Sequence, residues 1–458
     1  FVGEHATGST RLLVMFAVAS LNACNANDVL SESRAADHSG NANRAPSIGS
    51  RSVRPEERFL YDAWRDVNGF AGAYFDDSGS LVMLVTDLGT SAAAISLAKR
   101  RQVERGSLGL SSRTATVRVQ LARYSFETLR VYRDVIQSIL EERTYPIVFL
   151  DLDERLNRVV VGFERSEART ASAVFLKRLA AEGVDTLAIR TQEVDAFQGD
   201  SRLSVHARTA LEASQPGSIL DGTFDPIVGG IVGERSDGGC TLGFTASRNG
   251  IPGFVSASHC SVLTFALDHS PFYQRFNFGT PRLIGTETVD PAPWQCGVHS
   301  CRASDASFYT GLGVAMGVGL VARTEPPIAS GLSAPSGSKN VNQAFPNLVV
   351  SGEMELWVAV GAPIHKVGAI TGWTKGNISR TCVDIWLGGL KKMNCGVEAD
   401  YRADNGDSGA PVFYFDDAHV NPPNLDRIRL AGVHSGRVSG MAIFAPMSRI
   451  QSDLGPLL

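Results

Sequence analysis

The pattern of apolar and polar positions divides the chain into two structured parts. Between residues 55 and 207, strand-like runs alternate with stretches whose apolar residues recur every three to four positions, as on one face of a helix. The strand-like runs are residues 74–75, 81–85, 115–122, 147–152, 158–163 and 186–190. Ser125 can cap one helix, which Pro146 ends, and a second helix is expected over residues 167–181. The central order β-α-β-β-α-β predicts an α+β domain of ferredoxin-like arrangement over residues 55–207.

Residues 227–458 follow a different pattern. Short apolar runs, such as 348–350, 356–360 and 430–434, are separated by Gly, Pro and Ser. Many short strands with frequent turns predict an all-β barrel or sandwich, and residues 447–454 are expected to form a closing helix. Residues 208–226 are expected to link the two parts, because residues 214–225 are rich in Gly, Pro and Ser.

The N-terminal end has the pattern of an export signal. The apolar run at residues 12–19 follows Arg11 and is too short to span a bilayer, but it has the length of a signal-peptide core. Cys24 comes directly after Leu21-Asn22-Ala23, which resembles a bacterial lipoprotein cleavage site with Cys24 as the lipidated residue. A plain signal of residues 1–23, cleaved near Ala23, is the alternative. Residues 24–54 are polar and are expected to form a flexible tether.

Charge and cysteine content narrow the classes of function. The chain has 458 residues, with 43 Lys and Arg against 47 Asp and Glu, so nothing favours a nucleic-acid partner. Apart from Cys24, six cysteines lie in the C-terminal half, and an even number in an exported domain favours disulfides. Their order suggests sequential pairs: Cys240 with Cys260, Cys296 with Cys301, and Cys382 with Cys395.

Two short stretches leave a cation site open as an alternative. Cys296, His299 and Cys301 could form part of a zinc site, but the sequence offers no second group of ligands at a suitable spacing. Asp151-Leu152-Asp153-Glu154 could bind a cation, although a solvated hairpin tip explains these charges more simply. We therefore expect no metal and no cofactor.

Three distant residues carry the candidate chemistry. Ser408 lies in Asn405-Gly406-Asp407-Ser408-Gly409, a turn-forming stretch that enters a strand-like Pro411-Val412. His259 precedes Cys260, and Asp305 precedes an apolar run. Serine needs a base to take its proton during attack, histidine can be that base, and a carboxylate can hold the imidazole in the correct tautomer. The glycine also lets the N–H groups of Gly406 and Ser408 point at one spot, an oxyanion hole.

The order His259, Asp305, Ser408 and the Gly-Asp-Ser-Gly motif resemble the chymotrypsin-type serine proteases, in particular their bacterial streptogrisin-like and α-lytic-protease-like branch. This resemblance covers about the C-terminal half and implies two six-stranded barrels. It also implies a disulfide between Cys240 and Cys260 beside the histidine. The α+β domain resembles the pro-regions of this branch, which fold and inhibit their protease. A docking or regulatory domain that is never removed is the alternative.

The resemblance has further implications for single residues. Ile227-Val228-Gly229-Gly230 is similar to an activated trypsin-type N-terminus, but Pro226 precedes it, so trypsin-style activation is not expected. The resemblance implies an internal basic partner for Asp407, either Lys366 or Arg380. It places Arg402 at the base of the specificity pocket and Ser435 on its wall. His434 matches a histidine of glutamate-specific relatives, so His434 and Arg402 would favour an acidic side chain.

These expectations combine into an exported serine endopeptidase that acts on protein or peptide substrates as a monomer. A lipid anchor through Cys24 is possible within this interpretation. One alternative is a catalytically silent protease-fold module that binds partners at the cell surface. Another is an esterase, or a protease that acts mainly on itself and cleaves between residues 208 and 227.

Overall fold

The computed structural model describes residues 55–107, 116–199, 217–235, 238–276, 280–353, 360–415 and 427–457. The predicted signal, Cys24 and the tether at 24–54 lie outside these residues, as do most of the run at 356–360 and the linker up to residue 216. All described residues belong to one compact unit, Ser52–Leu458. Within them, no helix combines the length and apolar character needed to cross a membrane.

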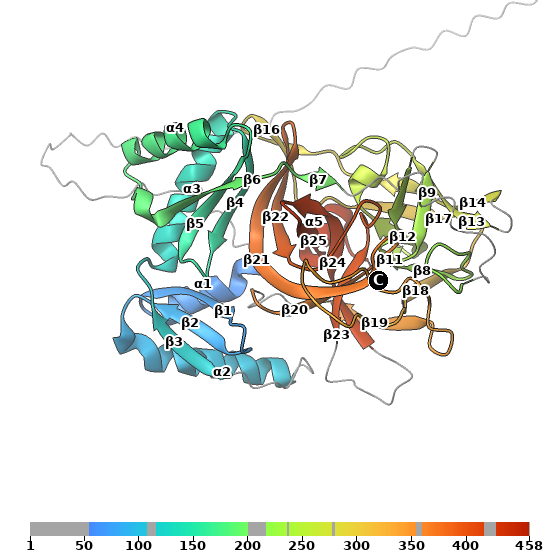
Figure 1. Cartoon of the computed structure of the whole chain (residues 1–458), viewed down its shortest axis with the longest axis horizontal. Helices are drawn as coiled ribbons and strands as arrows, with labels where there is room; N and C mark the ends of the chain where they lie inside the picture. The colour runs from blue at the N-terminus through green and yellow to red at the C-terminus, as the bar shows by residue number, and fades with distance from the viewer. Residues whose placement is uncertain are drawn as a thin grey trace, which may run out of the picture. The chain divides into compact units, whose positions relative to one another are not determined.

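A three-stranded sheet opens the N-terminal region (Figure 1). It consists of β1 (Phe70–Phe75), β2 (Leu81–Val85) and β3 (Val117–Leu121), with β1 antiparallel and β3 parallel to β2. Two helices belong to it, α1 (Arg58–Asp66) and α2 (Ser91–Ser107), preceded by the short 3₁₀ turns η1 (Pro55–Glu57) and η2 (Leu88–Thr90). Because β2 and β3 are parallel, the chain must cross back between them, and α2 makes that crossing.

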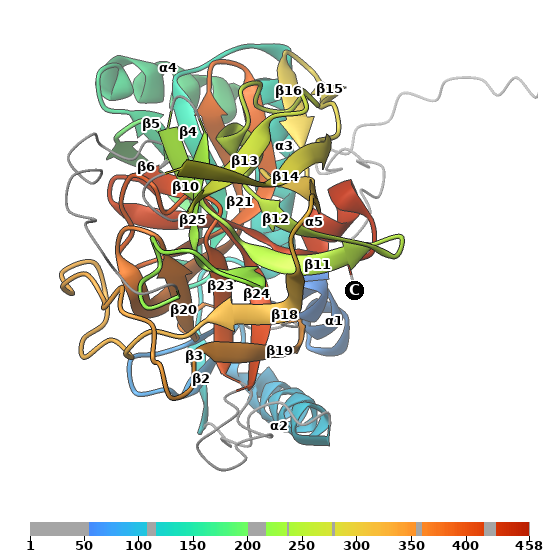
Figure 2. The same ribbon diagram turned by 90° about the vertical axis from the view of Figure 1, so that its right-hand side faces the viewer.

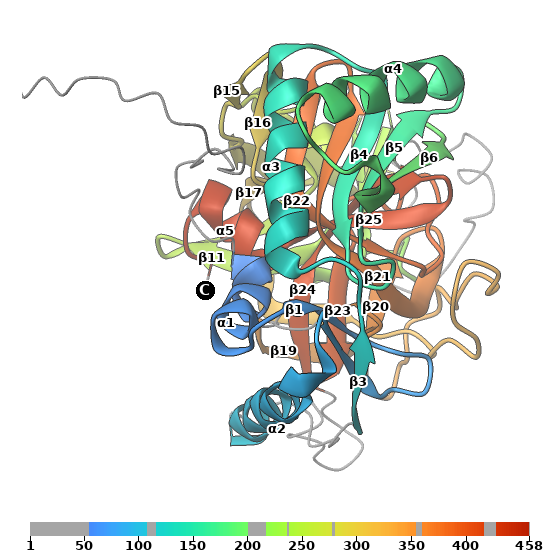
Figure 3. The ribbon, with the colours of Figure 1, turned by 90° about the vertical axis from the view of Figure 1, so that its left-hand side faces the viewer.

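The second part of the N-terminal region has two helices and three strands. Its elements are α3 (Phe126–Glu142), β4 (Ile147–Asp153), β5 (Arg158–Glu164), α4 (Ala168–Ala181), the 3₁₀ turn η3 (Thr186–Ala188) and β6 (Ile189–Val194). Ser125 caps α3 as predicted, since its hydroxyl accepts a hydrogen bond from the Thr128 N–H at 3.1 Å. The strands β4 and β5 form a hairpin, and β6 is parallel to β5. The two helices lie on one face of these strands (Figure 3).

The predicted ferredoxin-like arrangement is not formed as one sheet. The strand β3, which should have joined β4, β5 and β6, pairs with β2 in the other sheet. The prediction overlooked α2, which brings β3 beside β2. The free edge of β4 pairs instead with β21 (Gly372–Gly388) of the C-terminal half, with Phe149 opposite Ile385 and Leu150 opposite Asp384. The strands β4, β5 and β6 therefore extend a sheet of the C-terminal half.

The C-terminal half begins with a seven-stranded sheet (Figure 2). In order across the sheet, its strands are β10 (Gly238–Thr241), β9 (Val232–Arg235), β13 (Pro271–Phe276), β14 (Thr280–Val289), β17 (Ser307–Gly311), β12 (Ile251–Ser256) and β11 (Phe244–Arg248). All of its pairings are antiparallel. Its apolar core includes Phe254, Phe272 and Tyr309, which pack with ring centroids 4.7–5.5 Å apart.

Six further strands pair in a closed ring. They are β20 (Pro363–Gly368), β21, β22 (Lys391–Ala399), β25 (Met441–Pro446), β24 (Arg427–Val438) and β23 (Pro411–Phe415), and β23 pairs back with β20. Outside the ring lie β7 (Gln198–Gly199), β8 (Ile227–Gly229), β15 (Trp294–Cys296), β16 (His299–Arg302), β18 (Met316–Ala322) and β19 (Asn347–Glu353). The expected closing helix is α5 (Met447–Leu454).

The N-terminal strands and the C-terminal half share one core. Val148, Phe149 and Val160 are buried in the same apolar cluster as Val383 and Ile385. Burying each side chain of this size contributes roughly 1.5–3 kcal/mol, so the shared cluster holds the two regions together.

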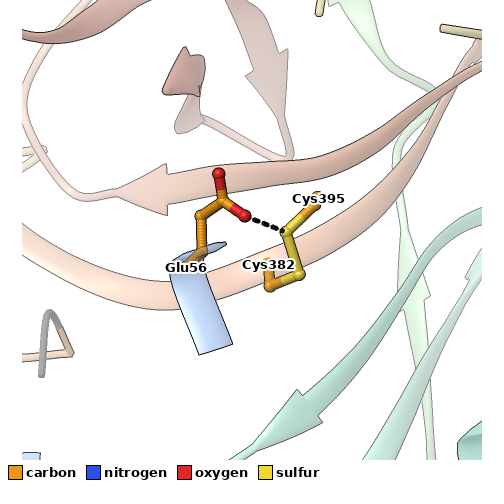
Figure 4. A group of neighbouring side chains, drawn as sticks. All are labelled: Glu56, Cys382 and Cys395. Carbon is orange, nitrogen blue, oxygen red and sulfur yellow. Dashed lines mark hydrogen bonds between the residues drawn. A yellow bond between two sulfur atoms is a disulfide. The ribbon is translucent and has the colours of Figure 1, made fainter. Parts of the chain in front are cut away.

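The beginning of the described chain is also fixed to the C-terminal half. Glu56 in η1 is 5% exposed. Its Oε2 lies 2.7 Å from a guanidinium nitrogen of Arg449 in α5 and 3.3 Å from Sγ of Cys395 (Figure 4). Cys395 is joined to Cys382, so this sulfur carries no proton and the second distance is a contact. The ion pair therefore anchors η1 to α5, and the sulfur contact places Glu56 against the disulfide between β21 and β22.

Candidate active site

The structure brings His259, Asp305 and Ser408 together from three separate segments. His259 lies in the 3₁₀ turn η5 (Ser258–Cys260) after β12, Asp305 lies just before β17, and Ser408 lies in the turn before β23. His259 Nδ1 is 2.6 Å from Asp305 Oδ2, and His259 Nε2 is 2.7 Å from Ser408 Oγ. The His259 backbone N–H also donates to Asp305 Oδ1, at 3.2 Å. One continuous chain of hydrogen bonds therefore joins carboxylate, imidazole and hydroxyl.

The carboxylate of Asp305 sets the direction of these hydrogen bonds within a buried site. The Asp305 side chain is fully buried, Ser408 is fully buried, and the His259 side chain is 12% exposed. A carboxylate only accepts, so the Nδ1 atom of His259 carries the proton. The neutral ring then offers Nε2 as an acceptor to the Ser408 hydroxyl. This is the arrangement that a general base beside a nucleophile requires.

Glycine lets the serine turn lie against the opposite sheet. Gly409 has φ +86°, and a Cβ there would lie 2.2 Å from both the Ser256 hydroxyl and the Thr241 carbonyl oxygen. The turn is fixed to β10 because the Thr241 N–H donates to the Ser408 carbonyl at 2.8 Å. No larger residue fits at position 409 without moving Ser408.

The same turn has two backbone N–H groups for which the described part of the chain offers no acceptor. Between residues 404 and 410, the N–H groups of residues 404, 405, 407, 409 and 410 donate hydrogen bonds within the protein. Those of Gly406 and Ser408 find no acceptor among the residues that the structure describes. Gly406 has φ +106°, which glycine adopts readily. Two such donors flanking one residue can hold the oxygen of a developing anion.

Lys366 is the partner of Asp407. Its Nζ lies 2.9 Å from Asp407 Oδ2, and both side chains are fully buried. Thr371 Oγ1 and the Ile370 N–H also donate to the carboxylate, at 2.6 and 2.9 Å. Burial opposes ionisation, but Lys366 and these hydrogen bonds hold the pKa of Asp407 below its usual range.

Arg380, the other candidate, lies at the boundary with the N-terminal region. Its guanidinium is 2.9 Å from Glu398, 3.3 Å from Asp151 and 3.6 Å from Asp153. Asp151, Asp153 and Glu154 are buried, at 0%, 8% and 3% exposure. The expectation of a solvated hairpin tip was therefore wrong, because Arg380 of β21 lies against Asp151 and Asp153, and Gly72 of β1 lies against Glu154.

The predicted pocket residues lie in different places. Ser435 adjoins the nucleophile, since its carbonyl oxygen lies 3.4 Å from Ser408 Oγ. His434 is fully buried, and its Nδ1 is 3.0 Å from the Tyr401 hydroxyl. Arg402 donates to the Ala334 carbonyl at 3.1 Å, and the described residues show no hydrogen bond between Arg402 and His434. His434 and Ser435 are therefore neighbours in β24, whereas Arg402 lies in another segment, before the serine turn.

A strand of the N-terminal region lies beside the triad, which sequence reasoning missed. Gln198 and Gly199 form β7, which pairs antiparallel with Arg437 and Gly436 of β24. A Cβ on Gly199 would lie 3.2 Å from Cδ2 of the His259 ring. An extended peptide bound beside the triad along β24 would occupy this place. A polar two-residue strand leaves no periodic signal in a sequence, so no pattern could have identified it.

The six cysteines form the three pairs suggested by their order: Cys240 with Cys260, Cys296 with Cys301, and Cys382 with Cys395. The first bridge ends next to His259. The second removes the thiolates that a zinc site at residues 296–301 would need. His299 is buried there, and its Nε2 lies 3.0 Å from the Leu140 carbonyl. Glu56, Cys382 and Cys395 are close enough to share an ion, but the two sulfurs are oxidised.

Comparison with known proteins gives structural matches alone. No family model matches the sequence, and no curated protein is significantly similar to it. Protease A of Thermobifida fusca matches 51% of the chain over 98% of its own length, with 19% identity and a TM-score of 0.35. Nocardiopsis protease matches 50% over 98% of its length, with 19% identity and a TM-score of 0.34. A glutamic-acid-specific serine protease matches 51% over its full length, also with 19% identity and a TM-score of 0.34.

About half of the chain matches bacterial chymotrypsin-fold serine proteases in structure. At this distance the matches assign no activity. The functional assignment therefore depends on where the side chains lie.

Proposed function

We propose that this chain is a serine endopeptidase whose catalytic residues are Ser408, His259 and Asp305. The observation that carries the proposal is the hydrogen-bond chain from Asp305 through His259 to Ser408, with distances of 2.6 and 2.7 Å. The order of the three segments and the closed ring of six strands support it, and we infer that this ring is the second of two barrels.

In this mechanism Ser408 Oγ attacks the carbonyl carbon of the scissile peptide bond while His259 Nε2 takes its proton. Asp305 stabilises the imidazolium that forms. The N–H groups of Gly406 and Ser408 donate to the oxyanion of the tetrahedral intermediate. His259 returns the proton to the leaving amine, which leaves an acyl group on Ser408. A water molecule, deprotonated by the same imidazole, then hydrolyses this acyl-enzyme.

Labelling with a fluorophosphonate tests the assignment. The wild-type protein should be labelled at Ser408, and Ser408→Ala should lose both the label and hydrolysis of casein, by about 10⁴-fold or more. Asn405→Ala, which changes an exposed neighbour in the same turn, serves as a matched control and should still be labelled. A wild-type protein that is folded, cut between residues 208 and 227 and still unlabelled would support the silent binding module instead.

The position of β7 favours a second property, that of a self-inhibited precursor. Because β7 lies along β24 beside His259, it would exclude an extended substrate from this place. We infer that the N-terminal region restrains the protease until the connection at residues 208–227 is cut. The mass of the mature chain tests this inference. A cut in the wild type that is absent in Ser408→Ala indicates self-cleavage, whereas an uncut, active chain contradicts it.

We also infer a preference for an acidic side chain on the N-terminal side of the cut. The Tyr401 hydroxyl can donate to His434 Nδ1, which makes Nε2 the protonated nitrogen and hence a donor to a carboxylate. Arg402, held by the Ala334 carbonyl, is the less favourable of the two residues predicted to bind the acidic side chain. Cleavage of a mixed peptide library tests this preference, and selection of basic or large apolar residues would exclude it.

The cellular setting is part of the proposal. Three disulfides favour an oxidising compartment outside the cytoplasm. Lipidation of Cys24 and a monomeric state stay predictions from the sequence.

A further inference from the structure

Behind the triad lies a buried ion network centred on Arg302. This arginine ends β16, three residues before Asp305, and its side chain is 1% exposed. Its guanidinium donates to Asp290 through one terminal nitrogen. The other terminal nitrogen and Nε lie 3.2 and 3.3 Å from Asp453 Oδ2. Two carboxylates from distant segments therefore share one buried cation.

Each carboxylate also fixes a residue that adjoins the triad. Asp290 Oδ2 accepts from the hydroxyl of Ser258 at 2.7 Å, and Ser258 directly precedes His259. Asp453 Oδ2 accepts from both the N–H and the hydroxyl of Ser304, each at 2.8 Å, and Ser304 directly precedes Asp305.

Arg302 also reaches the other side of Asp305. Its second terminal nitrogen donates to the carbonyl of Ala306 at 2.7 Å. The ring of Phe265 lies 4.9 Å from the guanidinium carbon, and the Phe265 N–H donates to the Ser258 hydroxyl at 2.8 Å. The backbone on both sides of Asp305 and the residue before His259 are therefore linked to one guanidinium.

We propose that Arg302 is a positioning residue that sets the distance between Asp305 and His259. This inference rests on the proposed function. Its physical reason is geometric, because a planar guanidinium can hold Asp290, Asp453 and the Ala306 carbonyl in three fixed directions at once. A lysine keeps the positive charge but offers one compact ammonium, which cannot span all three. Because catalysis depends on placement to a fraction of an ångström, loosening this network should slow the chemical step more than it weakens binding.

The test compares Arg302→Lys with Arg449→Met in the full chain. Arg449 lies in the same helix as Asp453, one turn earlier, and its ion pair with Glu56 touches no residue of the network. For both variants, the saturating rate of fluorophosphonate labelling and the concentration at half-saturation are measured, with circular dichroism as the check of folding. We expect Arg302→Lys to lower the saturating rate at least tenfold with half-saturation within twofold of wild type. Arg449→Met should leave both within twofold. A folded Arg302→Lys with the wild-type rate overturns the proposal.

Two further measurements cover the other outcomes. If Arg302→Lys does not fold, Asp453→Asn takes its place, with the same expected loss and the same overturning result. If the wild type is not labelled even after the connection at residues 208–227 has been cut, the proposed function has failed rather than the network. The positioning role of Arg302 is then tested by NMR, through the strongly downfield resonance expected for the proton between His259 and Asp305. Its loss in Arg302→Lys but not in Arg449→Met supports positioning, and its persistence in both contradicts it.

Discussion

At the scale of single residues, the sequence was most informative where chemistry demands a fixed local pattern. Gly406 and Gly409 both have positive φ and allow the tight turn around Ser408, so one motif indicated the candidate site. His259 and Asp305 could be found because their order and neighbours accompany that motif. Arg302, Asp290 and Asp453 could not, because buried ion pairs between distant segments have no characteristic spacing in a sequence.

Asp407 shows how the structure settles an alternative that the sequence left open. Both Lys366 and Arg380 were suitable by charge, but β20 brings Lys366 under the serine turn, whereas Arg380 faces the N-terminal carboxylates. The carboxylate organises the turn, since the Asp404 N–H also donates to it, at 3.0 Å. Its buried partner therefore matters for the oxyanion donors as well as for stability.

We predict that Lys366→Met destabilises the protein by about 3–5 kcal/mol, because it leaves Asp407 as an unpaired buried charge. The change should also lower the labelling rate of Ser408, since the turn would relax. Chemical unfolding and fluorophosphonate labelling measure the two effects. Lys375→Met, which removes a lysine from the neighbouring strand β21, is the matched control and should cost less than about 1 kcal/mol. If both variants lose the same free energy of unfolding, the ion pair of Lys366 with Asp407 contributes little to stability.

At the scale of elements, prediction succeeded where periodicity was clear. The helix α3 follows its apolar spacing and its Ser125 cap, and the hairpin of β4 and β5 follows two apolar runs. The helix α2 was missed because, over residues 91–102, where the structure describes its side chains, the buried ones are Ala94, Leu97 and Ala98, and basic residues follow them. That omission assigned β3 to the wrong sheet. The strand β7 was missed because it depends entirely on its partner, β24.

The contact of β7 with the triad leads to a prediction about Gly199. A side chain there would meet the His259 ring, with a Cβ only 3.2 Å from Cδ2. We expect Gly199→Val to displace β7 and to increase casein hydrolysis by the uncut chain several-fold. Gln198→Val places the same side chain at the adjacent, exposed position and is the matched control. If the Gly199→Val variant has unchanged activity although β7 has moved away from the His259 ring, β7 does not limit the access of substrate to Ser408.

At the scale of the whole molecule, the two regions behave as one body because they share strands, core and charges. The strand pairing of β4 with β21 and the common apolar cluster do not themselves titrate. The charges do, because several carboxyl groups meet few cations at this boundary. The ionisable groups concerned are Asp151, Asp153, Glu154, Glu398, Glu57, Arg133 and Arg380. The sequence suggested two separate domains and did not predict the contact between them, because that contact forms only when β4 pairs with β21.

This boundary should respond to pH. Burial raises the pKa of Asp151 and of Glu154 well above their usual values, and Arg380 offsets the effect only in part at Asp151. A carboxyl group whose pKa is raised in the folded state contributes its full stabilisation at acidic pH. It loses that contribution as the pH rises through the raised pKa. The contact between the two regions should therefore weaken toward alkaline pH.

Small-angle scattering of the Ser408→Ala chain, which cannot cut itself under the proposed mechanism, measures this weakening as an increase in the radius of gyration. We expect the increase from mildly acidic to alkaline pH to be smaller in Asp151→Asn, because an amide cannot ionise and one source of repulsion around Glu154 disappears. Asp77→Asn, at a 98% exposed site of the same region, should follow the parent chain. If the Asp151→Asn chain expands as much as its parent, ionisation of Asp151 is not the cause of the pH response. Because separation of the regions also removes β7 from His259, the same expansion should coincide with faster fluorophosphonate labelling in the chain that retains Ser408.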